Sequence, residues 1–280
     1  MQVERLIQTP PSEALPPTGE AKRGIRTFAT AIGNEVSKGL IDLWRGKIAS
    51  FLELILFGLF FLAITFAVGR GAFHREQVMP LLLGFVGYIF FHMQTNRLFW
   101  GLLGEMQSGT LEQMYLSPLP SWLLTIGLQV ASIVEAAISA LLLSLFIDLV
   151  VQVPLPLHWA ALLPLVLLVL SSAGYSLILG GLTLLFKRLE VLKELFQLVV
   201  LIFGGVLVPL DRMPGWMATI ARFLPLTPGV EVLRKTLLDR VSLGTLLWLV
   251  GSAAAYLALG IVIFRWCERI AKRRGTLGQY

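Results

Sequence analysis

Residues Ile48–Val68 read IASFLELILFGLFFLAITFAV, a run in which Glu53 is the only charged residue. A helix of about 20 apolar residues crosses the hydrocarbon core of a bilayer, so this run predicts a membrane span. The composition extends the argument to the whole chain, because only 14% of its 280 residues are charged. Soluble domains carry about 25% charged residues, and much of this chain therefore cannot face water.

Five further apolar segments predict an all-α polytopic membrane protein with six transmembrane helices. The six predicted spans are residues 48–68, 78–99, 122–151, 155–186, 195–209 and 243–264. Pro164 predicts a kink in the fourth span, because proline removes a backbone donor and clashes with the preceding turn. The fifth span would extend only roughly 23 Å, which is less than the roughly 30 Å of the hydrocarbon core.

The distribution of basic residues predicts the orientation. The net charge is +6, and we attribute it to cytoplasmic loops rich in Lys and Arg and not to a nucleic-acid partner. With the N-terminus inside, the inner segments hold 16 of the 23 basic residues and the outer segments hold seven. Six spans return the C-terminus to the same side. We therefore expect a multi-pass protein of the cell membrane (plasma or inner membrane) with both termini in the cytoplasm.

The segments outside the spans differ in composition. Residues 1–21 contain four prolines and predict a disordered cytoplasmic tail, and residues 266–280 predict a basic cytoplasmic tail. Residues 22–47 place apolar residues at three- and four-residue steps with Lys and Arg between them. That pattern predicts an amphipathic helix lying in the membrane interface, and a helix packed on a soluble core is the alternative. No signal peptide is visible, so we expect the first span to be retained.

The segment before the last span predicts two short helices, Pro214–Phe223 and Pro228–Leu238. Pro228 suits the first position of a helix, and Thr227 could cap its free N–H groups. The apolar character of the segment predicts a re-entrant helical hairpin in the outer leaflet. Irregular backbone at that depth must be buried in protein or line a wet cavity. The alternative is an ordinary extracellular loop with two surface helices.

Signatures of catalysis are missing from the sequence. It contains no G-x-x-x-x-G-K-[ST] motif that would hold ATP, and neither H-E-x-x-H nor G-x-S-x-G. The three histidines lack the spacing of a metal site, and the single Cys267 cannot form an intrachain disulfide. We therefore expect no catalytic residue, metal or cofactor in this chain.

One ionisable residue is expected deep in the membrane. Glu135 lies near the middle of the third span, with Gln129 and Ser132 on the same helical side. Ionisable residues at such depth mark functional sites by default. Glu135 and Gln129 are therefore candidates for a translocation path or for binding a cationic substrate group. The alternative is a structural role, in which Glu135 is hydrogen-bonded to a neighbouring helix.

The most polar stretch between spans, residues 104–120, reads GEMQSGTLEQMYLSPLP and is expected in the cytoplasm. On a helix, Glu105, Ser108 and Glu112 would share one face. A short helix parallel to the membrane would then present two carboxylates to a cytoplasmic partner, with Met106 among the residues that could add apolar contacts. The alternative is a solvated loop that caps two spans.

Two stretches resemble ABC-2 type transporter permeases. The first is Glu105 followed by the run Gly109-Thr-Leu-Glu112 and by Ser117-Pro118. The second comprises Gly205–Pro209, Met213–Trp216 and Leu224–Arg234. The two stretches follow one another along the chain in the same order as in the family, and the chain has the six predicted spans of such permeases. The resemblance covers about residues 25–265.

The resemblance implies a role for each stretch, with residues 48–265 as the ABC-2 type transmembrane domain. The residues implied to couple the chain to an ATPase are Glu105, Ser108, Gly109, Thr110, Leu111, Glu112 and Pro118. The residues implied to form the re-entrant segment are Pro209, Pro214, Trp216, Pro225, Pro228, Glu231 and Arg234.

The resemblance also implies partners and an activity. Such permeases pair as homo- or heterodimers and bind two cytoplasmic ABC ATPase subunits, which hold ATP and Mg²⁺. The chain itself would not be an enzyme. It would export an amphipathic, drug-like or lipid-linked substrate along a path between two permeases, with spans two and five prominent. The motif resembles drug and antibiotic exporters most. The alternatives are a membrane-embedded lipid-modifying enzyme, a channel and a self-sufficient secondary transporter.

Overall fold

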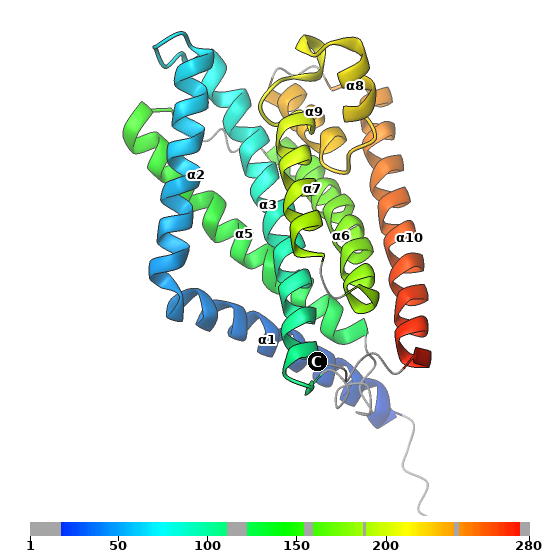
Figure 1. Ribbon diagram of the computed structural model, residues 1–280. Coiled ribbons are helices and arrows are strands. Elements are labelled where there is room, and N and C mark those ends of the chain that lie inside the picture. The colour runs from blue at the N-terminus through cyan, green and yellow to red at the C-terminus, as the bar shows by residue number, and fades with distance from the viewer. Residues whose placement is uncertain (1–17, 111–121, 154–158, 187–188, 238–240, 275–280) are drawn as a thin grey trace, which may run out of the picture.

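The computed structural model describes residues 18–110, 122–153, 159–186, 189–237 and 241–274, and all regular structure within these ranges is helical (Figure 1). The longer helices are α1 Thr18–Arg45, α2 Lys47–Val68, α3 Arg75–Gln107, α5 Trp122–Val151, α6 Leu162–Leu185, α7 Glu190–Phe203 and α10 Leu243–Arg274. The shorter elements are η1 Trp159–Ala161, η2 Leu210–Arg212, α8 Gly215–Ala221 and α9 Thr227–Leu237.

Five of the described helices are long and apolar enough to cross a membrane. They are α2, α3, α5, α6 with its preceding 3-10 turn, and α10, and they correspond to predicted spans one to four and six. The predicted fifth span corresponds to α7, which has only 14 residues. At about 1.5 Å per residue, a helix of this length is too short to cross the hydrocarbon core alone. Non-helical backbone follows α7 over residues 204–208.

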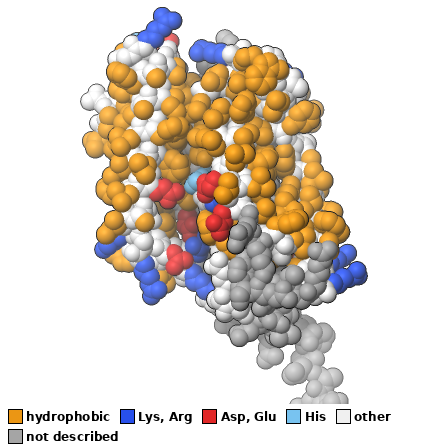
Figure 2. Space-filling model, viewed as in Figure 1, with side chains coloured by type: hydrophobic (Ala, Val, Ile, Leu, Met, Phe, Trp, Pro, Cys, Tyr) orange, Lys and Arg blue, Asp and Glu red, His pale blue; other side chains and the backbone are white. Residues whose placement is uncertain are grey.

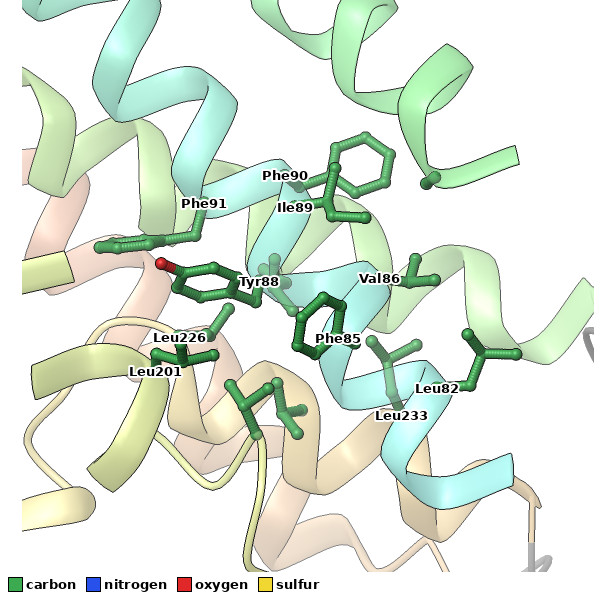
Figure 3. Close-up of a cluster of buried hydrophobic side chains, with 14 of the residues drawn as sticks. Leu82, Phe85, Val86, Tyr88, Ile89, Phe90, Phe91, Leu201, Leu226 and Leu233 are labelled. Carbon is green, nitrogen blue, oxygen red and sulfur yellow. The ribbon is translucent and has the colours of Figure 1, made fainter. Parts of the chain in front are cut away.

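The central element of the bundle is α3. In its most apolar window 78% of the residues are buried, against 17% in the corresponding windows of α2 and α10. Figure 3 shows Phe85, Tyr88 and Phe91 of α3 packed near Leu201 of α7 and Leu226 at the start of α9. Within a bilayer such contacts stabilise through van der Waals packing, because lipid tails are as apolar as the side chains.

The tightest helix pair is formed by α6 and α10. A Cβ atom added at Gly174 would lie within 2.5 Å of the backbone at Tyr256 and Leu257 of α10. Gly260 meets the backbone of Gly174 in the same way. Small residues at these crossing points allow the two backbones to approach, as is common between membrane helices. The pair therefore forms one rigid side of the bundle.

A single long helix, α1, runs across one end of the bundle instead of along it (Figure 1). It packs against α5, where the rings of Phe28 and Trp122 lie 6.0 Å apart. Its second half exposes large apolar side chains at Leu40, Ile41 and Trp44. The helix spans Thr18–Arg45, so it begins four residues before the predicted amphipathic segment and ends two residues before its predicted end.

Three local expectations differ from the structure. Pro164 is the third residue of α6 and does not kink it, because the first turn of a helix tolerates a missing N–H. The last helix does not end at residue 264 but continues to Arg274, so most of the predicted basic tail is helical. Thr227 does not cap α9 from outside: it is the first residue of that helix, and its buried hydroxyl has no hydrogen-bond partner.

Candidate functional site

A buried polar network joins the middle of α3 to the first half of α7. On α3, Asn96 lies one turn after His92, and the Asn96 amide nitrogen is 2.7 Å from Nε2 of His92. The Asn96 side-chain oxygen accepts hydrogen bonds from Lys193 Nζ and from Gln197 Nε2 of α7, at 2.5 and 3.4 Å. The network therefore links residues that are about 100 positions apart in the sequence.

Lys193 is the charged centre of this network and is fully buried. Its ammonium lies 2.8 Å from Oε1 of Glu194 and 5.2 and 5.0 Å from the ring centres of Phe99 and Trp100. Burial of a cation is costly unless it is paired and hydrogen-bonded. Here one carboxylate, one amide oxygen and two aromatic faces share that task, and aromatic faces attract a cation through the ring quadrupole.

The second end of the network reaches α2. Nε2 of His92 lies 3.4 Å from a carboxylate oxygen of Glu53, and the rings of Phe57 and Tyr88 flank the imidazole at 5.3 and 5.7 Å. Within the described residues, Nδ1 of His92 and Oε1 of Gln197 are buried without a hydrogen-bond partner. The network therefore retains capacity to bind a further polar group.

Two carboxylates of the network are accessible from outside the chain. The side chain of Glu53 is 47% exposed and that of Glu194 is 62% exposed. Figure 2 shows acidic side chains and a histidine gathered on the face between α2 and α7, with apolar side chains around them. Carboxylates that lie among lipid tails are costly, so a membrane position of this face would require water or a protein partner beside Glu53 and Glu194.

A separate ionic cluster holds α1, α3 and α5 together. Arg97 of α3 lies 3.2 Å from Asp42 of α1 and 3.4 Å from Glu135 of α5. Glu135 therefore has an ionic partner on a neighbouring helix, but its Oε1 makes no hydrogen bond among the described residues, so the structural alternative stays open. The other predicted path residue, Gln129, donates a hydrogen bond to Ser176 of α6. The structure does not bring Glu135 and Gln129 together at one site, and their role in a path remains a prediction.

The segment that the sequence predicts to be re-entrant is organised around Arg234 of α9, which is buried. Its guanidinium donates to three backbone oxygens: Pro80 in α3 at 2.9 Å, Val206 at 2.6 Å and Gly205. The last two belong to the non-helical backbone after α7. Burial lowers the pKa of Arg234 to about 10, and Glu231 and Asp211 act in the opposite direction, so the guanidinium stays charged at neutral pH.

The other residues that the sequence predicts for this segment lie in the short helices and turns near Arg234. Pro209 and Pro214 directly precede η2 and α8, Pro228 is the second residue of α9, and the Pro225 carbonyl accepts a hydrogen bond of 2.8 Å from Ser171 of α6. Trp216 is exposed, and Glu231 pairs with Lys235 at 3.1 Å. Buried Leu226, Val230 and Leu233 belong to the main core cluster, so α9 is an integral part of the bundle.

The predicted coupling segment lies at the end of α3 and beyond. Ser108 and Gly109 form a turn after Gln107, and Gly109 adopts φ +70°, a left-handed conformation that ends helices. The uninterrupted helix needed for a common face of Glu105 and Ser108 with Glu112 does not form. Instead, Thr110 Oγ1 donates to the Glu105 carboxylate. Leu111, Glu112 and Pro118 lie outside the described residues.

Met106 has a different role from the predicted one. Its side chain is almost fully buried with Leu102, Leu128 and Leu184 in a second apolar cluster. It is therefore not available for contacts with a cytoplasmic partner. Sequence reasoning expected it on the surface because the end of α3 was taken as a separate surface helix.

Sequence reasoning missed the network around Lys193. Lys193 was counted among the cytoplasmic basic residues, whereas the structure places it inside α7. A signal was present: His92 and Asn96, and likewise Lys193 and Gln197, are spaced four residues apart within apolar segments. Such a spacing puts both polar residues on one face of a helix, and two polar faces in a membrane bundle favour mutual contact.

The fold defines the chain as a helical protein with five described helices that could cross a membrane, and its described residues contain no group of His, Cys, Asp or Glu that could hold a metal ion. Residues 33–238 match the family described as ABC-2 type transporter, which is well over half of the chain. The chain belongs to this family.

Curated relatives agree with this membership. The chain is similar to the probable multidrug ABC transporter permease YbhR of Escherichia coli strain K12, with 24% identity over 140 residues. The same values hold for the protein of that name in Escherichia coli O157:H7. The match covers 50% of this chain and 38% of the length of each relative.

Proposed function

We propose that the chain is the permease subunit of an ATP-driven exporter that moves amphipathic small molecules, drug-like or lipid-linked, across the cell membrane. A separate cytoplasmic ABC ATPase would bind ATP and Mg²⁺ and hydrolyse ATP. A second permease, identical or related, would complete the path. Family membership and the similarity to a probable multidrug permease support this proposal.

One observation carries the transport role. Glu53 and Glu194 are exposed on the face that α2 and α7 form, within segments otherwise suited to lipid. A second permease facing this surface would enclose the carboxylates in an aqueous path. The buried Lys193 and the half-buried Asn96 and His92 would form the wall behind them. Exposed carboxylates favour substrates that carry a positive charge beside an apolar body.

The proposed topology has six crossings with both termini in the cytoplasm. In this arrangement α7 crosses part of the bilayer, and the backbone of residues 204–208 continues toward the outer side. The hydrogen bonds from Arg234 to Gly205 and Val206 support this, because non-helical backbone in a membrane needs internal partners. The segment 209–237 would then be the re-entrant hairpin, and α1 would lie in the inner interface with Trp44 toward lipid.

The proposed link to the ATPase is the segment that begins at Glu105. Movement of the ATPase would reach α3 directly, because α3 continues to Gln107 and is the central helix of the bundle. This is rigid-body switching of a packed assembly. Exposed ion pairs stabilise docking by only about 0–1 kcal/mol each. Docking would therefore depend on apolar contacts as well, and these cannot come from Met106.

The test is purification of the tagged chain in mild detergent, with crosslinking in native membranes beforehand, and identification of co-purifying proteins by mass. We expect a P-loop ATPase in roughly equal amount, whose ATP hydrolysis increases when a cationic amphiphile is added. A folded, monodisperse protein that carries no ATPase even after crosslinking would contradict the proposal. That result would favour a channel, a secondary transporter or a lipid-modifying enzyme.

A further inference from the structure

A groove separate from the polar network lies between α5, α6 and α10. Its volume is about 490 Å³, within the roughly 300–1,000 Å³ typical of small-molecule sites. Ile126, Leu177, Leu257 and Ile261 are among the apolar side chains that line it. All three helices are candidate membrane spans, so in a bilayer the apolar part of the groove would face lipid tails.

One end of the groove is polar and basic. Arg265 and Glu268 of α10 and Gln129 of α5 line it together with Trp122. Arg265 is exposed, whereas the carboxylate of Glu268 is compensated by Lys272 Nζ at 2.8 Å. Arg269 and Arg273, which follow on the same helix end, do not line the groove, so Arg265 is the cation among the lining residues of the groove.

Trp122 and Trp266 locate this end relative to the bilayer. Both indoles are exposed, and tryptophan is enriched at the level of the lipid headgroups. The parts of this groove match the parts of a phospholipid. The apolar walls fit an acyl chain, the tryptophan at the mouth lies at the level of the interface, and the arginine beside it can bind the headgroup phosphate. Arginine binds phosphate oxygens through two parallel N–H donors, which a single lysine cannot do.

We infer that the groove between α5, α6 and α10 binds one phospholipid with an anionic headgroup. Its phosphate contacts the Arg265 guanidinium, and an acyl chain lies along Ile126, Leu177 and Ile261. In the proposed orientation this end of α10 lies in the cytoplasmic leaflet, where anionic lipids are concentrated and each basic side chain contributes about 1 kcal/mol of attraction. A lipid there would touch α5, α6 and α10 at once and hold the rigid α6–α10 pair against α5.

Native mass spectrometry of the purified chain in detergent tests this inference without an ATPase or a transported substrate. The result is therefore independent of the proposed transport function. Phosphatidylglycerol and phosphatidylcholine are titrated separately, and the occupancy of the first bound lipid is measured. We expect phosphatidylglycerol to bind at least fivefold more tightly than phosphatidylcholine, which is the effect of about 1 kcal/mol for one basic contact.

Two variants and one matched control make the test specific. Arg265→Gln should weaken phosphatidylglycerol binding about fivefold, whereas Arg269→Gln, the same change one turn later and outside the groove, should weaken it less than twofold. Ile261→Trp fills the groove from a partly exposed position and should reduce the binding of both lipids.

Equal effects of Arg265→Gln and Arg269→Gln would overturn the inference, because they would indicate diffuse attraction to the basic helix end. Equal binding of both lipids to the unmodified protein would overturn it as well. A third overturning result would be a dimer that binds no lipid and that Ile261→Trp dissociates, since a second copy would then occupy the groove.

Discussion

Two buried cations lie at opposite ends of α7, and they are held in different ways. Arg234 near one end is bound by three backbone oxygens, from Pro80, Gly205 and Val206. Lys193 near the other end is bound by the side chains of Asn96 and Glu194 and by two aromatic rings. Backbone oxygens cannot change partners without unfolding, whereas side chains can rotate.

The difference separates a structural cation from a candidate functional one. Around Arg234 every group is fixed by the path of the main chain. Around Lys193, Glu194 is exposed, Gln197 retains an unpaired oxygen, and His92 retains an unpaired nitrogen among the described residues. A ligand could therefore exchange for existing partners at Lys193, but not at Arg234. The following variants test this contrast, beginning with the largest expected effect.

Arg234→Met should have the largest effect, on stability. It leaves the Gly205 and Val206 oxygens of the non-helical backbone without the donors that Arg234 supplies, and each such loss costs about 1–3 kcal/mol, so the total should be at least about 2 kcal/mol. Thermal unfolding followed by size-exclusion chromatography in detergent should show a low yield of monodisperse protein. The control is Arg222→Met, which removes an exposed arginine of the same outer segment and should be neutral. If Arg234→Met unfolds at the normal temperature, the hydrogen bonds from Arg234 to the backbone do not stabilise the fold as proposed.

Lys193→Met should affect transport more than stability. Methionine preserves the contact with Phe99 and Trp100, and Glu194, which loses its partner, is 62% exposed and stays solvated, so no unpaired charge is left buried. We expect stability within about 2 kcal/mol of the unmodified protein, and at least a tenfold loss of cationic-dye export from vesicles.

The control for Lys193→Met is Lys235→Met, which removes a partly exposed lysine that is paired with Glu231. It should leave export unchanged. If Lys193→Met exports the dye at the normal rate, the network around Lys193 is structural in the same sense as Arg234, and the contrast between the two cations fails.

Glu53→Gln and Glu194→Gln should each reduce export of a cationic amphiphile several-fold. Export of a neutral analogue of similar size should be nearly unchanged, because only the cation loses an electrostatic partner. Glu53 is partly exposed, so Glu53→Gln should change stability by no more than about 0.5 kcal/mol. Glu194→Gln removes the carboxylate partner of the buried Lys193 and should destabilise by about 1 kcal/mol or more. Glu76→Gln, in the exposed first turn of α3, is the control. Equal losses for charged and neutral substrates would exclude a role in charge selection.

The smallest effect is expected in the outer segment, where Thr227→Val removes a buried hydroxyl that has no partner. The change should be neutral or stabilise by a few tenths of a kcal/mol, since no hydrogen bond is lost. Ser171→Ala is the matched comparison, because it deletes a hydrogen bond to the Pro225 carbonyl and should destabilise by about 1 kcal/mol. Thermal unfolding of both variants is the measurement, and a loss of stability for Thr227→Val as large as that for Ser171→Ala would contradict the unpaired state of the Thr227 hydroxyl.

Sequence reasoning was accurate for long apolar helices and weaker for short polar elements. The third span was predicted with its observed bounds, Trp122–Val151, because length and hydropathy suffice for such a helix. The end of α3 was misjudged, because the left-handed conformation of Gly109 is a local choice that composition does not indicate. Arg234 was placed correctly in the segment before the last span, but its three backbone partners could not be foreseen.

The sequence by itself determined that the chain belongs in a membrane, where five of its spans lie, and which family motifs follow one another. Only the tertiary structure decided that Lys193 meets Asn96, that Arg234 binds the backbone after α7, and that Glu135 pairs with Arg97. The physical reason is that helices apolar on nearly every side, such as α3 and α5, have no pronounced apolar face to fix their rotation. Their mutual orientation follows from close packing of side chains, which becomes visible only once the helices are assembled.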